Sequence, residues 1–215
     1  MKLSHLAETL IGSEIIKLAG EIKEKQAKGE KIYNFTIGDF DPKVFPIPAE
    51  FEQEIVAAYK EGLTNYPPAD GILDLRKAVS EFIAEHEQLT YDPAKEIVIS
   101  CGGRPIIYAT FRTILDRGEK VVYATPSWNN NHYTHFLEAE HVVLETKPEN
   151  DFMPTAAELE PLLKGATLLA LCSPQNPTGT AFGKQQLEEI CDLVIAENKS
   201  RGADEKPLYI LFDQM

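Results

Sequence analysis

The apolar run Leu168-Leu169-Ala170-Leu171-Cys172 leads directly into Ser173-Pro174-Gln175-Asn176-Pro177-Thr178-Gly179. The run is typical of a buried strand in a parallel sheet, and the second stretch is a turn that begins where this strand ends. Each proline fixes its own φ and biases the residue before it toward extended geometry, so the backbone is restricted on both sides of Asn176. Because ligands of open α/β sheets bind outside the carboxyl ends of the strands, Asn176 is a candidate binding residue. The alternative is an ordinary surface turn.

Three other predicted strands end in equally particular residues. Residues 96–100 lead into a glycine turn and an apolar helix, an arrangement that suits a phosphate. Residues 120–124 lead into a loop with Trp128, the only tryptophan of the chain, and residues 208–213 end on Asp213. Each feature alone has a simpler explanation, namely a plain turn, a packed tryptophan or a helix cap. Four such features at strand ends of one sheet predict a single site.

A phosphate cradle, a flat aromatic face, an amide and a buried carboxylate together suit a phosphorylated aromatic ring such as pyridoxal phosphate. The phosphate would lie on the glycine turn and the ring would stack on Trp128. Asn176 would donate to the phenolic oxygen of the ring, and Asp213 would pair with the pyridine nitrogen and keep it protonated. The predicted cofactor-binding residues in these strand-end loops are therefore Gly102, Gly103, Arg104, Trp128, Asn176 and Asp213.

The chain resembles the N-terminal half of a class I aminotransferase of the aspartate aminotransferase family, which has the fold of pyridoxal-phosphate-dependent transferases of fold type I. The resemblance covers nearly all of the 215 residues, and its specificity comes from the order and spacing of segments rather than from any one of them. The matching segments are Gly38 with residues 41–46, residues 66–71 followed by 75–78, residues 102–104, 126–128 and 176–179, and Asp213.

The resemblance implies a transaminase that moves an amino group between an amino acid, aspartate-like or aromatic, and a 2-oxo acid. It implies a homodimer in which Tyr66 reaches the cofactor phosphate of the neighbouring subunit. It also implies that the backbone at Gly38 lies near the substrate carboxylate, with Trp128 and Asn176 as further substrate-binding residues. The family's Schiff-base lysine, and the arginine that binds the substrate α-carboxylate, are expected beyond Met215. No catalytic residue is therefore expected within this segment, which reads as part of a longer protein.

Two departures from the family pattern concern the site. Pro105 stands where the family usually has a residue with a free N–H, so one possible phosphate contact is lost, although proline suits the start of a helix. The segment Gly38-Asp39-Phe40-Asp41-Pro42-Lys43 differs from the commoner Gly-Glu-Pro-Asp-Phe, which leaves the choice of substrate open.

Apolar periodicity predicts alternating strands and helices. The strands are predicted at 96–100, 120–124, 141–145, 167–172 and 208–213, and the helices at 13–28, 49–60, 71–87, 104–115, 129–139, 155–163 and 184–198. This order is typical of an α/β fold with a mostly parallel sheet and helices on both faces. By resemblance, residues 1–45 are the N-terminal part of a small domain, and residues 46–215 form a large cofactor-binding domain that is incomplete at its C-terminal end.

Composition narrows the possible partners. The net charge of −13 argues against binding to nucleic acid or an anionic membrane, since both require a basic surface. No stretch is apolar for long enough to span a bilayer, and residues 1–5 are not followed by a signal core. The three cysteines read as reduced thiols of a cytoplasmic protein. The expected partners are small molecules and a second copy of the chain.

Other readings remain open. His132 and His135 have a spacing that metals can use, but no further ligand lies nearby in sequence, so no metal site is predicted. A non-catalytic protein of the same fold, or a regulator that lacks the lysine, is the main alternative to a transaminase. A nucleotide-binding Rossmann domain that uses Gly102 and Gly103 is a more distant one, because Gly-x-Gly-x-x-Gly is absent.

Overall fold

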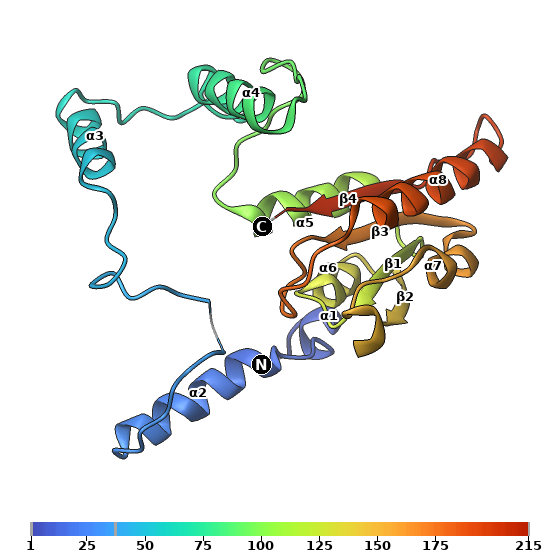
Figure 1. The fold of residues 1–215 in the computed structure, drawn as a ribbon, viewed down its shortest axis with the longest axis horizontal. Coiled ribbons are helices and arrows are strands. Elements are labelled where there is room, and N and C mark those ends of the chain that lie inside the picture. Colours follow the sequence, from blue (N-terminus) through green and yellow to red (C-terminus); the bar gives the residue numbers. More distant parts are fainter. Residues whose placement is uncertain (1, 37, 215) are drawn as a thin grey trace. The chain divides into compact units, whose positions relative to one another are not determined.

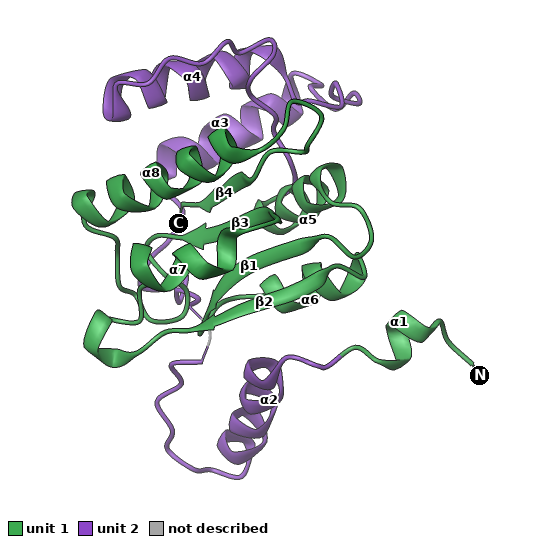
Figure 2. Cartoon of the chain, turned by 90° about the vertical axis from the view of Figure 1, so that its right-hand side faces the viewer, with its two compact units in different colours: residues 1–10, 102–215 green, residues 11–101 purple. Residues whose placement is uncertain are grey.

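A computed structural model describes residues 2–36 and 38–214 of the chain. These residues form two compact units (Figure 2): unit 1 comprises residues 1–10 and 102–215, and unit 2 comprises residues 11–101. Unit 1 holds the sheet, whereas the described part of unit 2 contains helices and no strand. The predicted domains, 1–45 and 46–215, stay a prediction.

Unit 1 is built on a four-stranded sheet in the order β2-β1-β3-β4, in which every neighbouring pair is parallel (Figure 1). The strands are β1 (Lys120–Thr125), β2 (Glu140–Glu145), β3 (Ala166–Cys172) and β4 (Tyr209–Asp213). The two central strands are buried along almost their whole length, as continuous apolar runs in a parallel sheet should be. The predicted α/β fold with a parallel sheet is confirmed.

Helices cover both faces of this sheet because successive strand side chains point to opposite sides. On one face, Val121 and Tyr123 pack with residues of α5 (Gly103–Ile114) and α6 (Asn130–Phe136). On the other face, Val122 and Leu169 pack with α7 (Ala156–Leu163) and α8 (Lys184–Ser200). Thr155 and Glu158 form a capping box at the start of α7, since each side chain bonds to the other residue's backbone N–H.

The predicted strand at 96–100 is wrong. The Ile99 N–H donates to the Asp70 carbonyl oxygen over 3.0 Å, but residues 96–100 pair with no strand of the described chain. An apolar run becomes a strand only where a second backbone completes the ladder, and periodicity cannot supply that partner. Two short elements were also not predicted, the helix α1 (His5–Glu8), capped by Ser4, and the 3₁₀ turn η1 (Pro148–Asn150).

Helix ends differ from prediction where the backbone turns left-handed. The helix predicted at 129–139 is shorter, because Asn129 and Glu138 have positive φ and bracket α6. In unit 2, α2 (Glu14–Ala27) and α3 (Ala49–Lys60) lie within their predicted ranges, but α4 (Leu73–Glu87) begins two residues late. The cause is Gly71, whose φ is +95°, and whose backbone approaches the Ile99 side chain so closely that a Cβ would lie 2.6 Å from it.

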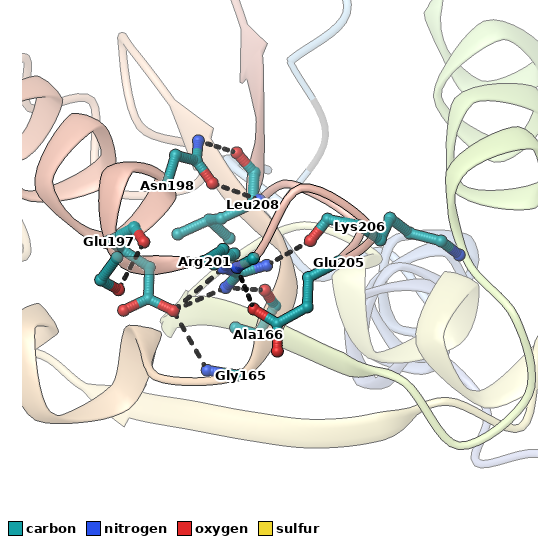
Figure 3. Close-up of polar contacts among 10 residues, drawn as sticks. Gly165, Ala166, Glu197, Asn198, Arg201, Glu205, Lys206 and Leu208 are labelled. Atoms are coloured by element: carbon teal, nitrogen blue, oxygen red, sulfur yellow. Dashed lines mark hydrogen bonds and ion pairs between the residues drawn. The ribbon is translucent and has the colours of Figure 1, made fainter.

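The start of β4 is held by side chains of α8 and of Arg201, the residue that follows this helix (Figure 3). The Arg201 guanidinium donates to the carbonyl oxygens of Lys206 and Ala166, both over 2.7 Å, and pairs with Glu197 over 2.8 Å. The Asn198 amide bonds to both the N–H and the C=O of Leu208. These contacts tie the segment before β4 to the first residue of β3, and so help to fix the register that places Asp213 opposite Cys172.

Replacing Arg201 with methionine is expected to lower the free energy of unfolding by about 2–4 kcal/mol, because the change leaves the largely buried Glu197 carboxylate without its cation. The side chains of this pair are only 10% and 18% exposed. The matched control is Lys184→Met, which breaks the Lys184–Glu188 pair on the same helix, where the side chains are 89% and 63% exposed. That control should cost less than about 1 kcal/mol. Urea unfolding of both variants measures the difference, and equal losses would contradict the assigned role.

Candidate functional site

A cavity of ≈ 230 Å³ lies within unit 1 at the carboxyl ends of β3 and β4. It is bounded by the first turn of α5, the loop after β1 and the turn after β3. Its walls include five of the six strand-end residues predicted to bind a cofactor. The lining residues are Gly103, Arg104, Ile107, Ser127, Trp128, Asn130, Tyr133, Leu171, Cys172, Asn176, Leu211 and Asp213.

The N-terminus of α5 forms one end of the cavity. Gly102, the sixth predicted residue, does not line the cavity but precedes the helix with a φ of +105°, a conformation that favours glycine. No side chain caps α5, so its first backbone N–H groups are available to an anionic ligand. Pro105 is the third residue of the helix and has no N–H, which leaves the turn one donor fewer, as predicted.

Arg104 and Trp128 form a contact that the sequence did not predict. The guanidinium carbon of Arg104 lies 5.4 Å from the centre of the Trp128 ring, within the range of a cation–π interaction. The pair places a permanent positive charge beside an aromatic face. This combination can recognise a ligand that carries both a phosphate and a flat ring.

Asp213 ends β4, and its Cα is paired with that of Cys172 at the end of β3. Burial raises the pKa of Asp213, and a hydrogen bond with Cys172 opposes this shift. Among residues 2–36 and 38–214, no cation forms an ion pair with this carboxylate. A charged carboxylate in such a place lacks compensation and is suited to a cationic ligand group.

Among the seven lining residues that were not predicted from the sequence, two carry ionisable side chains. Tyr133 comes from α6 and is buried; burial raises the pKa of its hydroxyl, while the charge of Arg104 lowers it and that of Asp213 raises it. Burial also raises the pKa of the Cys172 thiol, whose Sγ lies 3.1 Å from the Pro174 carbonyl oxygen. Tyr133 could have been identified only from the rotation of α6 about its axis, which the sequence does not give. The position of Cys172 beside Asp213 follows from the strand register.

Asn176 lies in a turn that its own backbone closes. The Gln175 N–H donates to the Thr180 carbonyl oxygen over 2.6 Å, and the Gly179 N–H donates to the Gln175 carbonyl oxygen over 2.7 Å. Gly179 has a φ of +75°, which favours glycine at this point. The turn predicted around Asn176 is therefore present, and Asn176 lines the cavity.

Tyr66 and Gly38 belong to unit 2, not to the group of residues that lines this cavity. The Tyr66 side chain is fully exposed, and a Cβ built on Gly38 would meet no atom within 4 Å. Their roles toward a partner's phosphate and a substrate carboxylate stay predictions.

The described residues contain no group of three or more metal-ligating side chains. The Nε2 of His135 lies 3.1 Å from the Leu6 carbonyl oxygen and 3.4 Å from the Thr9 hydroxyl, so this histidine packs against the N-terminal segment of unit 1. Of the helices that the structure describes, none has the length and apolar character to cross a membrane.

Comparison with known proteins gives one consistent family. The sequence model of "Aminotransferase class I and II" matches residues 30–200. A probable aspartate/prephenate aminotransferase of Aquifex aeolicus is 27% identical over 99% of this chain and 50% of its own length. Aromatic-amino-acid aminotransferase 2 of Thermococcus litoralis is 32% identical over 99% of this chain and 54% of its own length. The chain thus spans about half the length of the curated relatives it matches.

Solved structures agree with this comparison. Aspartate aminotransferase of Thermus thermophilus, solved with maleate, has a TM-score of 0.86 and 26% identity over 100% of this chain and 53% of its own. The Rhizobium meliloti aspartate aminotransferase has the same TM-score at 23% identity, over 99% of this chain and 51% of its own, and supports the fold alone.

Proposed function

This chain belongs to the class I and II aminotransferase family, and from that premise we propose that the protein is a pyridoxal-phosphate-dependent transaminase. It would move an amino group between an amino acid and a 2-oxo acid. The observation that carries the proposal is the convergence of Gly103, Arg104, Trp128, Asn176 and Asp213 on one cavity at the carboxyl ends of parallel strands.

The donor set of this cavity fits pyridoxal phosphate part for part. The uncapped N-terminus of α5 and the Arg104 guanidinium would hold the phosphate, and Trp128 would cover one face of the ring. Asn176 would donate to the phenolic oxygen. Asp213, which has no cation partner in the described chain, would pair with the protonated pyridine nitrogen. Every polar group that the cofactor presents at these points thus has a matching group in the cavity.

When bound, the cofactor supplies the electron sink that allows the substrate α-carbon to lose a proton. The chain's residues would serve this chemistry through position and charge. Asp213 would hold the proton on the pyridine nitrogen, because a carboxylate that is paired with a cation is favoured in its charged form. Trp128 would exclude water from one face of the ring, and the Asn176 amide would hold the phenolic oxygen. The lysine that would move the α-proton is proposed to lie beyond Met215.

We propose an aspartate-like or aromatic amino acid as the amino donor. The proposal is supported by the names of the relatives, which refer to aspartate, prephenate and aromatic amino acids. A cytoplasmic location is also proposed, since Cys101, Cys172 and Cys191 are all free thiols. The competing proposal is a non-catalytic member of the fold that binds the cofactor without turning over.

The experiment is a transaminase assay of the full-length protein, loaded with pyridoxal phosphate, on aspartate, glutamate and the aromatic amino acids with 2-oxoglutarate or oxaloacetate. Amino transfer that disappears when the cofactor is removed and returns when it is restored is the expected result. Stoichiometric cofactor binding without transfer to either 2-oxo acid would instead favour the non-catalytic member.

We further propose that the enzyme is a homodimer and that Tyr66 completes the partner's phosphate site. Tyr66→Phe is expected to weaken cofactor binding by about 0.5–3 kcal/mol, the range for one hydrogen bond to a charged acceptor. The matched control is Tyr59→Phe, which removes the same hydroxyl from another exposed tyrosine of unit 2 and should change nothing. Cofactor titration measures both variants, and light scattering should find each of them dimeric. A full-length protein that is fully active as a monomer would contradict the shared site.

A further inference from the structure

Gln175 is one of the few buried polar side chains of unit 1, at 5% exposure, and the proposed function gives it no role. It directly precedes Asn176 but does not line the cofactor cavity. Its side chain instead extends to the loop after β1, where Nε2 donates to the Pro126 carbonyl oxygen over 2.6 Å. This loop carries Trp128 two residues later. The bond therefore joins two loops that lie 49 residues apart in sequence and form different walls of the cavity.

The backbone of Gln175 is fixed as firmly as its side chain. Its N–H and C=O bond to Thr180 and Gly179 over 2.6 and 2.7 Å, and so hold the residue inside its own turn. The two ends of this turn are also joined to each other, because the N–H of Phe182, which follows the turn, donates over 3.2 Å to the hydroxyl of Ser173, the residue directly after β3. Because the backbone of Gln175 is held in this way, the hydrogen bond from its side-chain amide holds the Pro126 carbonyl at a fixed distance from the turn.

Other walls of the cavity have connections of their own. Asp213 is fixed against β3 by the strand ladder, in which its carbonyl oxygen accepts from the Ser173 N–H over 3.0 Å. Arg104 contacts the cavity's aromatic wall through the Trp128 ring. The Gln175 amide joins the Trp128 loop to the Asn176 turn by a direct hydrogen bond, and a buried amide that lost this acceptor would have to find another.

We propose that Gln175 is a positioning residue, which sets the distance and angle between the Trp128 ring and the Asn176 amide and thereby shapes the slot that receives a flat ring. The proposal rests on the proposed function for the identity of that ring, but not for the bridge itself. Glutamine suits the role because its amide is long enough to reach the neighbouring loop and can donate to a carbonyl at any pH.

The chemistry of the bridge supplies a sharp test. In Gln175→Glu the side chain keeps its size but, when ionised, has no proton to donate and repels the Pro126 carbonyl oxygen. When the carboxyl group is protonated it can donate again, so the bridge is restored at low pH. In Gln175→Met the bridge is absent at every pH. The matched control is Gln186→Met, which removes a glutamine hydrogen bond to the Gly183 N–H at the start of α8, also in unit 1 but outside the cavity.

The experiment uses the full-length protein and two readouts. The first needs no cofactor: acrylamide quenching of Trp128 fluorescence, taken as the difference from Trp128→Phe. Quenching should rise about twofold or more in Gln175→Met and stay unchanged in Gln186→Met. The second readout is the dissociation constant of pyridoxal phosphate, which should rise about tenfold in Gln175→Met, the change expected for one lost hydrogen bond, and less than twofold in the control.

The glutamate variant separates positioning from general loss of stability. Its dissociation constant for pyridoxal phosphate should approach that of the parent at low pH and rise with pH, in a step that the parent does not show. This variant also keeps the proposal testable if Gln175→Met does not fold. A pH dependence identical to that of the parent, or equal effects of Gln175→Met and Gln186→Met on both readouts, would overturn the proposal. If the parent binds no pyridoxal phosphate, the proposed function fails, while the quenching comparison still decides whether Gln175 positions Trp128.

Discussion

Replacing Asp213 with alanine in the full-length, cofactor-loaded protein is expected to lower kcat by about 10²- to 10⁴-fold, equivalent to roughly 3–5 kcal/mol of transition-state stabilisation. The carboxylate lies in a cavity where burial raises its pKa, so its charge is worth most when a cation faces it. Without this carboxylate the pyridine nitrogen would lose its proton, and the ring could no longer draw electrons from the substrate α-carbon. Steady-state kinetics at saturating cofactor and substrate measure the effect.

The companion variants separate charge from packing. Asp213→Asn keeps nearly the same volume but removes the charge, so it should lose about as much activity as Asp213→Ala. Asp213→Glu keeps the charge and should be milder. Asp192→Ala removes a carboxylate from an exposed position on α8 and should leave kcat unchanged. An Asp213→Ala enzyme whose kcat stays within a few-fold of the parent value would show that Asp213 does not hold the pyridine nitrogen.

The 215-residue chain by itself is expected to show no transaminase activity and to form no specific covalent bond to pyridoxal phosphate. In the family that the sequence resembles, the lysine that bonds to the cofactor follows the position of Asp213, and no lysine of this chain lies after Asp213. Incubation with the cofactor, borohydride reduction and peptide mass mapping test this directly, because reduction makes any such bond permanent.

The full-length protein is the positive control, in which one modified lysine per subunit is expected beyond Met215. Exposed lysines of the 215-residue chain will react weakly and without preference, so the criterion is stoichiometry at a single position. A single, stoichiometric modified lysine between residues 1 and 215 would refute the assignment of the catalytic lysine.

Much of unit 1 could be predicted because its strands are short apolar runs that end in turn residues. The runs at 120–125 and 166–172 are buried on both sides of a parallel sheet, so their composition alone identifies them. The run at 96–100 also has an apolar centre, Ile97-Val98-Ile99, but it has no strand beside it in the described chain. A run becomes a strand only where another backbone lies beside it. The residues of the run itself do not determine whether such a backbone is present.

The residues of the site also fall into those that the sequence could predict and those that it could not. Trp128, Asn176 and Asp213 could be predicted because each ends or follows a strand, and the carboxyl ends of parallel strands meet at one edge of the sheet. Tyr133 and Gln175 could not, because their roles depend on the rotation of α6 and on a bond to a loop 49 residues away. The cation–π contact of Arg104 is likewise a product of packing, since either residue could have faced solvent.

The central claim is that the cavity lined by Gly103, Arg104, Trp128, Asn176 and Asp213 is the pyridoxal phosphate site. A crystal structure of the full-length protein with the cofactor tests it most directly. The predicted result is a phosphate within hydrogen-bonding distance of the first turn of α5, a ring against Trp128, and a pyridine nitrogen about 2.7–2.9 Å from an Asp213 carboxylate oxygen. A cofactor bound elsewhere, or a ring whose nitrogen faces away from Asp213, would contradict the claim.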